Sequence, residues 1–100
     1  MGKHQVWLQK HCLGDDKLYI VGGGQQPHIG CIVLCEPSKP TQIINRGNHK
    51  EQIVLQPLAE HACKKYNTTV TVLGGIHIDN ATIKDIALIK KHCKELLECI

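Results

Sequence analysis

The apolar pattern of the chain changes at Gly47, and this change limits the possible fold more than any other feature. Before Gly47, short apolar runs alternate with turn-forming segments: Gly-Asp-Asp at 14–16, a glycine-rich loop at 22–27 and Pro-Ser-Lys-Pro at 37–40. Short apolar runs bounded by such segments are typical of β-strands. We therefore expect four strands, at residues 4–12, 17–21, 29–35 and 41–45. The third is apolar throughout, which predicts a central, buried strand.

After Gly47, apolar residues recur at helical spacing and predict a helix over about residues 49–66. Pro57 lies within this range, and a proline inside a helix costs about 3 kcal/mol and usually kinks it. The alternative is a regular helix that starts at Pro57, because proline is tolerated in a first turn. Asn67 suits the left-handed position that ends a helix.

The last third of the chain predicts a strand followed by a second helix. Residues 69–73 are rich in β-branched side chains, which favour a fifth strand. Thr82 and Asp85 have the spacing of a capping box, which marks the start of a helix. The helix then carries an apolar stripe made of Ile83, Ile86, Ala87, Cys93, Leu96, Leu97 and Ile100.

These elements predict an α+β fold in the order ββββ-α-β-α. We expect a mostly antiparallel sheet of about five strands, the first four in a meander, with two helices packed on it. The length of 100 residues fits a single domain over residues 1–100. A domain of this size has a small stability margin, so we also expect a homodimer or larger homo-oligomer.

The composition of the chain argues against nucleic acid and membrane as binding partners. The net charge is +3, the lysines are dispersed, and only three aromatic residues are present. Nucleic-acid binders cluster their positive charge and use aromatic stacking, so we expect no nucleic acid as a partner. No apolar run approaches the roughly 20 residues needed to cross a bilayer, and the N-terminus lacks the apolar core of a signal peptide. We therefore expect a cytoplasmic protein without a membrane partner, whose six cysteines are free thiols.

Counting strand directions brings three segments to one end of the expected meander. These are the stretches at 22–30, 46–51 and 74–82, and each contains glycine and one histidine. Both expected helices also begin at this end. A helix N-terminus offers unpaired N–H groups and a partial positive charge, and glycine lets a ligand approach the backbone. The sequence therefore predicts a pocket for a phosphorylated or otherwise anionic ligand. A strand at 51–55 instead of a helix would reverse the directions that follow it.

We take the candidate binding residues from these three segments. They are Gly23, Gly24, His28, Arg46, His49, Lys50, Gly75, His77, Asp79 and Asn80. Simpler interpretations stay open, since the glycines could form only a hairpin tip, and Asp79 and Asn80 could only cap the last helix. The three histidines His28, His49 and His77 could alternatively bind zinc at an enzyme site with Glu51 as general base. No catalytic residue is otherwise assigned.

The same segments resemble a known family. GGGQQPHIGCIVLCEP, GNHKE and GGIHIDNAT with the amphipathic helix after it are similar to the LpdD-like prenylated flavin chaperones, over roughly residues 17–98. These are small D-type proteins found with prenylated-FMN-dependent decarboxylases of hydroxyarylic acids, and their fold is similar to that of proteasome assembly chaperones of types 3 and 4. The GGIHIDNAT segment is the most specific part of the resemblance.

The resemblance implies a non-catalytic accessory role. The protein would bind or deliver prenylated FMN or FMN as cofactor, or help mature the catalytic subunit of a hydroxyarylic acid decarboxylase as partner. The phosphate of FMN agrees with the anionic ligand expected from the loops. Two alternatives remain: the three-histidine metal-dependent enzyme, and a pure protein-assembly module in which the loops are only turns.

Overall fold

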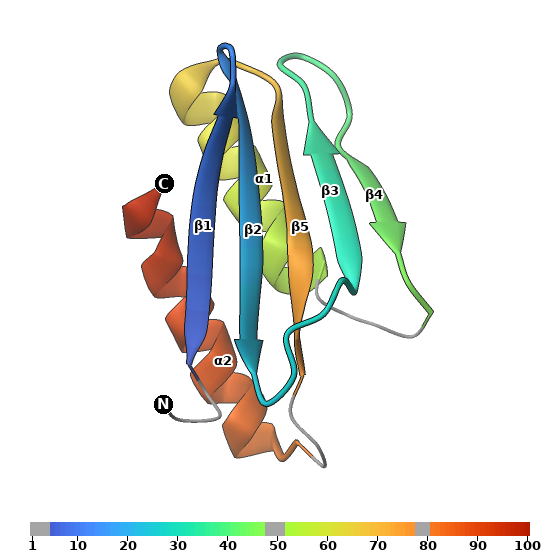
Figure 1. Cartoon of the computed structure of the whole chain (residues 1–100), viewed down its shortest axis with the longest axis vertical. Coiled ribbons are helices and arrows are strands. Elements are labelled where there is room, and N and C mark those ends of the chain that lie inside the picture. Colours follow the sequence, from blue (N-terminus) through green and yellow to red (C-terminus); the bar gives the residue numbers. More distant parts are fainter. Residues whose placement is uncertain (1–4, 48–51, 78–80) are drawn as a thin grey trace.

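The computed structural model describes residues 5–47, 52–77 and 81–100 (Figure 1). In chain order, the elements are β1 (Val6–Leu13), β2 (Asp16–Gly24), β3 (Cys31–Cys35), β4 (Gln42–Asn45), α1 (Gln52–Tyr66), β5 (Val70–His77), α2 (Ile83–Leu96) and the short 3₁₀ helix η1 (Leu97–Cys99). The expected α+β class and the ββββ-α-β-α order are confirmed. No helix within these three ranges is long and apolar enough to cross a membrane.

The strands form one five-stranded sheet in the order β1-β2-β5-β3-β4. The pairs β1–β2, β3–β4 and β3–β5 are antiparallel, and β2–β5 is parallel. The sheet is thus mostly antiparallel, as expected, but the expected meander is wrong because β5 lies between β2 and β3. The expected central place of the third strand is also wrong, since β5 holds it.

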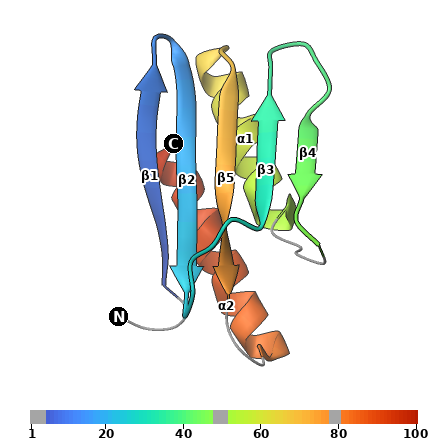
Figure 2. The same cartoon turned by 45° about the vertical axis from the view of Figure 1, so that its right-hand side comes forward.

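Both helices lie on the same face of the sheet, where they bury the core (Figures 1 and 2). Helix α1 packs against β3 and β5, and α2 packs against β1. Alternate strand residues point toward the helices, as the two-residue period of a strand requires. The largest fully buried side chains are those of Tyr19, Leu55, Leu58, Val21, Val33, Val70, Val72 and Cys31. The core is therefore built from aliphatic side chains and cysteines, with one tyrosine.

The glycines of β2 and β5 lie inside strands, which corrects the expected loop at 22–27. Strand β2 continues to Gly24 and pairs in parallel with β5 up to His77. At Gly74, with φ +139°, an added Cβ would lie 1.7 Å from the carbonyl oxygen of Val21. Only glycine allows this approach of two backbones. The glycines are consequently not a flexible hairpin tip.

Helix α1 spans Gln52–Tyr66 and runs through Pro57, so it does not start at the proline. Pro57 is exposed, whereas Leu55, Leu58, Ala59 and Ala62 are buried. Burial of one aliphatic side chain contributes about 1.5–3 kcal/mol, so this apolar face outweighs the cost of the proline. Asn67 has φ +51°, as expected of a helix stop. The capping box of Thr82 and Asp85 is also present.

The close approach of β2 and β5 predicts a large difference between two glycine substitutions. Gly74→Ala should lower the free energy of unfolding by more than about 3 kcal/mol, because the new methyl group collides with the backbone of β2. Gly14→Ala is the control: Gly14 also has positive φ, but nothing lies within 4 Å of its added Cβ. This control should cost only about 1 kcal/mol. Urea denaturation measures both, and equal losses would contradict the packing role of Gly74.

Candidate functional site

The three segments selected from the sequence begin or end at one end of the sheet. Strands β2, β4 and β5 finish there, and β3, α1 and α2 start there, at the lower end of Figure 1. The register agrees, since Gly24 of β2 pairs with His77 of β5. Inserting β5 between β2 and β3 changes the strand order but reverses no strand. The argument from strand direction therefore holds although the meander is wrong.

The connection from β2 to β3 passes around the end of β5 and is tied to it by backbone hydrogen bonds. The N–H of Gln25 donates to the carbonyl oxygen of His77 at 2.7 Å, and the N–H of Gly30 donates to that of Gly74 at 2.8 Å. Gly24 has φ +72°, and an added Cβ there would lie 2.3 Å from the His77 carbonyl oxygen. This loop is thus held against β5 by its backbone.

Arg46 joins the same end from β4. Its N–H donates to the carbonyl oxygen of Gly30 at 2.9 Å, and its Nη1 donates to the carbonyl oxygen of Ile29 at 3.2 Å. The residue is exposed. The guanidinium has donors beyond the one used by Ile29, so Arg46 places a positive charge with donor capacity at this end.

Two paired glycines form a flat strip of backbone beneath two rings. Gly22 of β2 is the register partner of Gly75 of β5, and Trp7 of β1 is the partner of Gly22. An added Cβ at Gly22 would lie 2.3 Å from Cζ2 of Trp7. At Gly75 it would lie 2.9 Å from Nε2 of His28. The absence of side chains here therefore makes room for an indole and an imidazole.

The two described histidines of the site stand edge to face. The ring centroids of His28 and His77 are 6.0 Å apart, with an interplanar angle of 83°. Nδ1 of His28 lies 3.1 Å from the carbonyl oxygen of Gln26, and its N–H donates there in the matching tautomer. Both rings are half-buried. Nε2 of His28 then faces the Gly75 backbone.

A metal site of three histidines is not assembled within the described ranges. In residues 5–47, 52–77 and 81–100, no group of three or more His, Cys, Asp and Glu side chains is arranged to hold a metal ion. His49 lies outside these ranges, as do Lys50, Glu51, Asp79 and Asn80. Their expected roles remain predictions.

The two helix starts at this end differ in their capacity for an anion. At α2, the Asp85 carboxylate accepts from the N–H of Thr82 at 3.0 Å, and the Thr82 hydroxyl accepts from the N–H of Asp85 at 3.1 Å. The chain's own carboxylate thus already faces the positive end of α2. In α1, the first turn from Gln52 has no acidic residue, and the Asn45 amide donates to the Gln52 side chain. The start of α2 is therefore a poor place for an anion; at α1 the described residues of the first turn carry no opposing carboxylate, and Glu51, which precedes them, lies outside the described ranges.

One of the candidate binding residues from the sequence packs against its own chain. An added Cβ at Gly23 would lie 2.4 Å from the carbonyl oxygen of Gln5, so this glycine packs against the chain that leads into β1. Trp7, by contrast, was not selected from the sequence, although its ring covers Gly22. The sequence could have indicated this position of Trp7. With a two-residue turn at Gly14 and Asp15, counting equal numbers of residues back and forward along the hairpin places Trp7 opposite Gly22.

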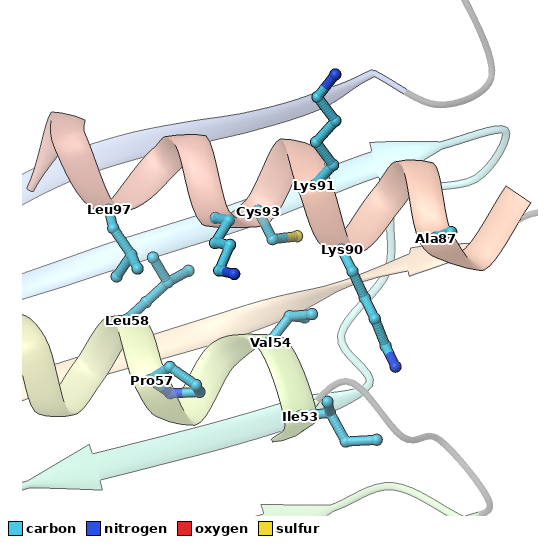
Figure 3. A pocket seen from close by; sticks show the side chains of 10 residues that line it. Ile53, Val54, Pro57, Leu58, Ala87, Lys90, Lys91, Cys93 and Leu97 are labelled. Atoms are coloured by element: carbon cyan, nitrogen blue, oxygen red, sulfur yellow. The ribbon is translucent and has the colours of Figure 1, made fainter.

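A second concave region lies between the two helices and extends to the first turn of α1. It is a groove of about 530 Å³ lined by Ile53, Val54, Pro57, Leu58, Ala87, Lys90, Lys91, Cys93, Lys94 and Leu97. In Figure 3, Val54, Leu58 and Leu97 point into the space between the helices, and Lys90 extends across it toward α1. Among the residues that the structure describes, the lining contains three lysines and no acidic residue, so this groove is apolar with positive charge beside it.

Comparison with known proteins agrees with the resemblance found in the segments. The model of the prenylated flavin chaperone LpdD-like domain matches residues 1–100, the whole chain. The match is longer than the 17–98 expected from the sequence and includes Trp7 and β1. No curated protein sequence matches the chain.

The six cysteines differ in exposure, and this predicts their reactivity. All six are free thiols; Cys12 and Cys99 are exposed, and the other four are buried. Burial raises the pKa of the Cys93 thiol to about 12, and burial with a hydrogen bond to Cys35 raises the pKa of Cys63. At pH 8, we expect a disulfide reagent to modify two thiols rapidly and the other four only after unfolding. Rapid reaction of four or more would contradict the buried core.

The same pKa shifts predict how stability changes with pH. A folded-state pKa above the unfolded value of about 8.5 means that the folded protein holds the thiol proton more tightly. The contribution to stability is complete below pH 8.5 and is lost as pH rises toward the folded-state values. We therefore expect the urea midpoint to fall between about pH 8.5 and 11. In the variant Cys93→Ala, the urea midpoint should fall less over this pH range. A fall as large as that of the unmodified protein would contradict the contribution of the Cys93 thiol.

Proposed function

We propose, because the chain belongs to the family of prenylated flavin chaperone LpdD-like domains, that it is a non-catalytic accessory protein for prenylated FMN. It would bind prenylated FMN or FMN and deliver it to the catalytic subunit of a hydroxyarylic acid decarboxylase, or use it to help that subunit mature. The observation that carries the proposal is the glycine strip at Gly22 and Gly75, over which the Trp7 and His28 rings lie.

The strip suits the flat ring system of a flavin. Glycines permit a planar group to approach the backbone, and neighbouring aromatic rings offer stacking or edge contacts. The imidazole rings of His28 and His77 add edge contacts for such a ring system. A flavin bound here would displace or stack on the Trp7 indole, which now covers Gly22.

Arg46 and the start of α1 suit the phosphate of the same ligand. Arginine binds phosphate oxygens with paired donors, and a helix N-terminus adds N–H groups and partial positive charge. Arg46 and Asn45 close the end of β4 directly before the segment that leads to α1. His49 and Lys50 lie in that segment and are proposed as further phosphate contacts. The groups required by a flavin phosphate therefore come from β4 and α1, and those required by its ring from β1, β2 and β5.

The first test is calorimetric titration with FMN and prenylated FMN, with riboflavin and inorganic phosphate as controls. We expect the phosphorylated flavins to bind at least tenfold more tightly than riboflavin, because only they reach Arg46 and α1. Arg46→Ala should remove most of this difference. No binding by any flavin would overturn the carrier role, and stoichiometric zinc in the purified protein would favour the three-histidine alternative.

A second set of variants tests the place of the ring. Gly75→Ala should weaken FMN binding at least tenfold, because the methyl group forces His28 out of position, and His77→Ala should weaken it similarly. His61→Ala is the matched control, since His61 is exposed on α1 away from the loops. Its affinity should be unchanged. Equal affinities in all four proteins would remove the site while leaving a protein-assembly role open.

For the decarboxylase partner, we propose the groove between α1 and α2 as the docking surface. Its apolar floor suits an apolar segment of the catalytic subunit, and its three lysines require acidic residues beside that segment. The loops lie at the starts of the helices, so a subunit bound along the groove would be close to the flavin end without covering it (Figure 1).

The charge of the groove can be reversed without disturbing the core. The double variant Lys90→Glu/Lys94→Glu should weaken capture of a candidate decarboxylase subunit at least tenfold, since both lysines are exposed and line the groove. Lys84→Glu is the control on the same helix, outside the lining. Flavin affinity should be unchanged in both variants. Loss of capture in the control alone, or in neither protein, would contradict this docking surface.

A further inference from the structure

The face of the sheet that points away from the helices is apolar and uncovered. Figures 1 and 2 show both helices on the other side; on this side the connection from β2 to β3 crosses in front of β5 at the lower end, and no described helix covers the rest of the face. Its side chains alternate along each strand with the buried core residues. None of them is among the side chains that pack against the core cluster. We refer to Leu18, Ile20, Ile32, Leu34, Ile44 and Leu73 as the open face.

The register places these side chains next to one another across four strands. Ile20, Leu73, Ile32 and Ile44 stand in one row, and Leu18 and Leu34 stand in the next with Thr71 between them. The row partners on β1 are Gln9 and His11. Neither row contains a lysine, arginine, aspartate or glutamate. Ile44 on the edge strand is 66% exposed. The open face is therefore a continuous apolar surface without fixed charge.

The two apolar rows have the size of the centre of a protein interface. Four strands spaced about 4.8 Å apart give a width of roughly 19 Å, and two residue rows give a length of roughly 14 Å. The resulting area is on the order of 270 Å² per protomer, close to the lower end of the range for the largest apolar patches on monomeric proteins. Specific interfaces combine an apolar centre with a polar rim, and Gln9, His11 and Gln42 supply polar side chains at the ends of these rows.

We propose that the open face is a homodimer interface in which the sheets of two copies pack face to face. Two sheets pack well at a separation of about 10 Å when their facing side chains are apolar. A face without charge matches a second copy of itself, since a two-fold axis brings identical patches together. It offers nothing to a charged partner, whereas the lysine-lined groove does. The sheet faces bind the second copy, and the helix layers lie outside.

This inference does not depend on the proposed function. The loops and the groove lie outside the two apolar rows, so each interaction can fail separately. Trp7 is the exception: it lies on the same face as the open rows, and its pair with Gly22 is two positions along the hairpin from the pair of Gln9 and Ile20. As the single tryptophan of the chain, it reports on this face by its fluorescence.

Sedimentation equilibrium of the purified full chain, without flavin, tests the proposal between about 1 and 100 µM. We expect a dimer mass, and a red shift of Trp7 emission on dilution as the interface opens. In the double variant Ile20→Glu/Ile44→Glu, four carboxylates would meet at the two-fold interface, so the dissociation constant should rise at least 100-fold. Ile86→Glu, which exposes a carboxylate at a 46% exposed position on α2, is the matched control and should stay dimeric.

Three results would overturn the proposal. One is a monomer mass for the unmodified chain at 100 µM, and another is a dimer that Ile86→Glu dissociates. The third is a dimer that persists in a folded Ile20→Glu/Ile44→Glu protein, with folding checked by circular dichroism. If the double variant does not fold, Ile44→Glu alone replaces it, because this side chain is exposed in the isolated protomer and its change cannot disturb the core.

Discussion

The close pairing of β5 with β2 is the interaction on which the rest of the structure depends. It holds β5 between β2 and β3, although two strands, their connections and α1 separate β2 from β5 in the chain. Gly74 allows the backbones to meet where any side chain would collide with Val21. Because the pairing continues to Gly24 and His77, the loop after β2 has to pass around the end of β5. The site at that end is thus a consequence of the sheet order.

The helices and strands follow from local residue patterns, whereas the order of the strands in the sheet depends on long-range pairing. The five strands and two helices were predicted from residue patterns, as were the stop at Asn67 and the cap at Thr82, because propensity and capping act over a few residues. The place of β5 depends on which strands pair across about fifty residues, and no local pattern encodes that choice. The predicted strand directions are correct although the predicted strand order is wrong, since a strand inserted between two others leaves their directions unchanged. The predicted helix through Pro57 is correct and the alternative start at the proline is not, because tertiary burial of α1 outweighs the local penalty of the proline.

The candidate site likewise combines features that could be predicted from the sequence and features that depend on long-range pairing. The predicted strand directions bring Gly24, His28, Arg46, Gly75 and His77 to one end of the molecule, and the structure places them there; that this end binds a ligand stays a prediction. The residue pattern assigned the glycines to a loop, however, because glycine is a turn residue far more often than a strand residue. In the structure, the glycines make room: Gly22 for the Trp7 ring and Gly75 for the His28 ring. Such a role depends on what lies across the strand, so only the hairpin register could have indicated it.

Trp7 links the two proposals that concern the open side of the sheet. Its ring covers Gly22 of the candidate flavin site, and its Cα stands on the same face as the rows of the proposed dimer interface. If a flavin moves the ring, the edge of the interface changes, and if a second copy holds the ring, the strip at Gly22 changes. Thermodynamic linkage then requires that flavin shifts the dimer equilibrium by the same factor by which the dimer shifts flavin affinity. A carrier built in this way would load and release its ligand according to its state of assembly.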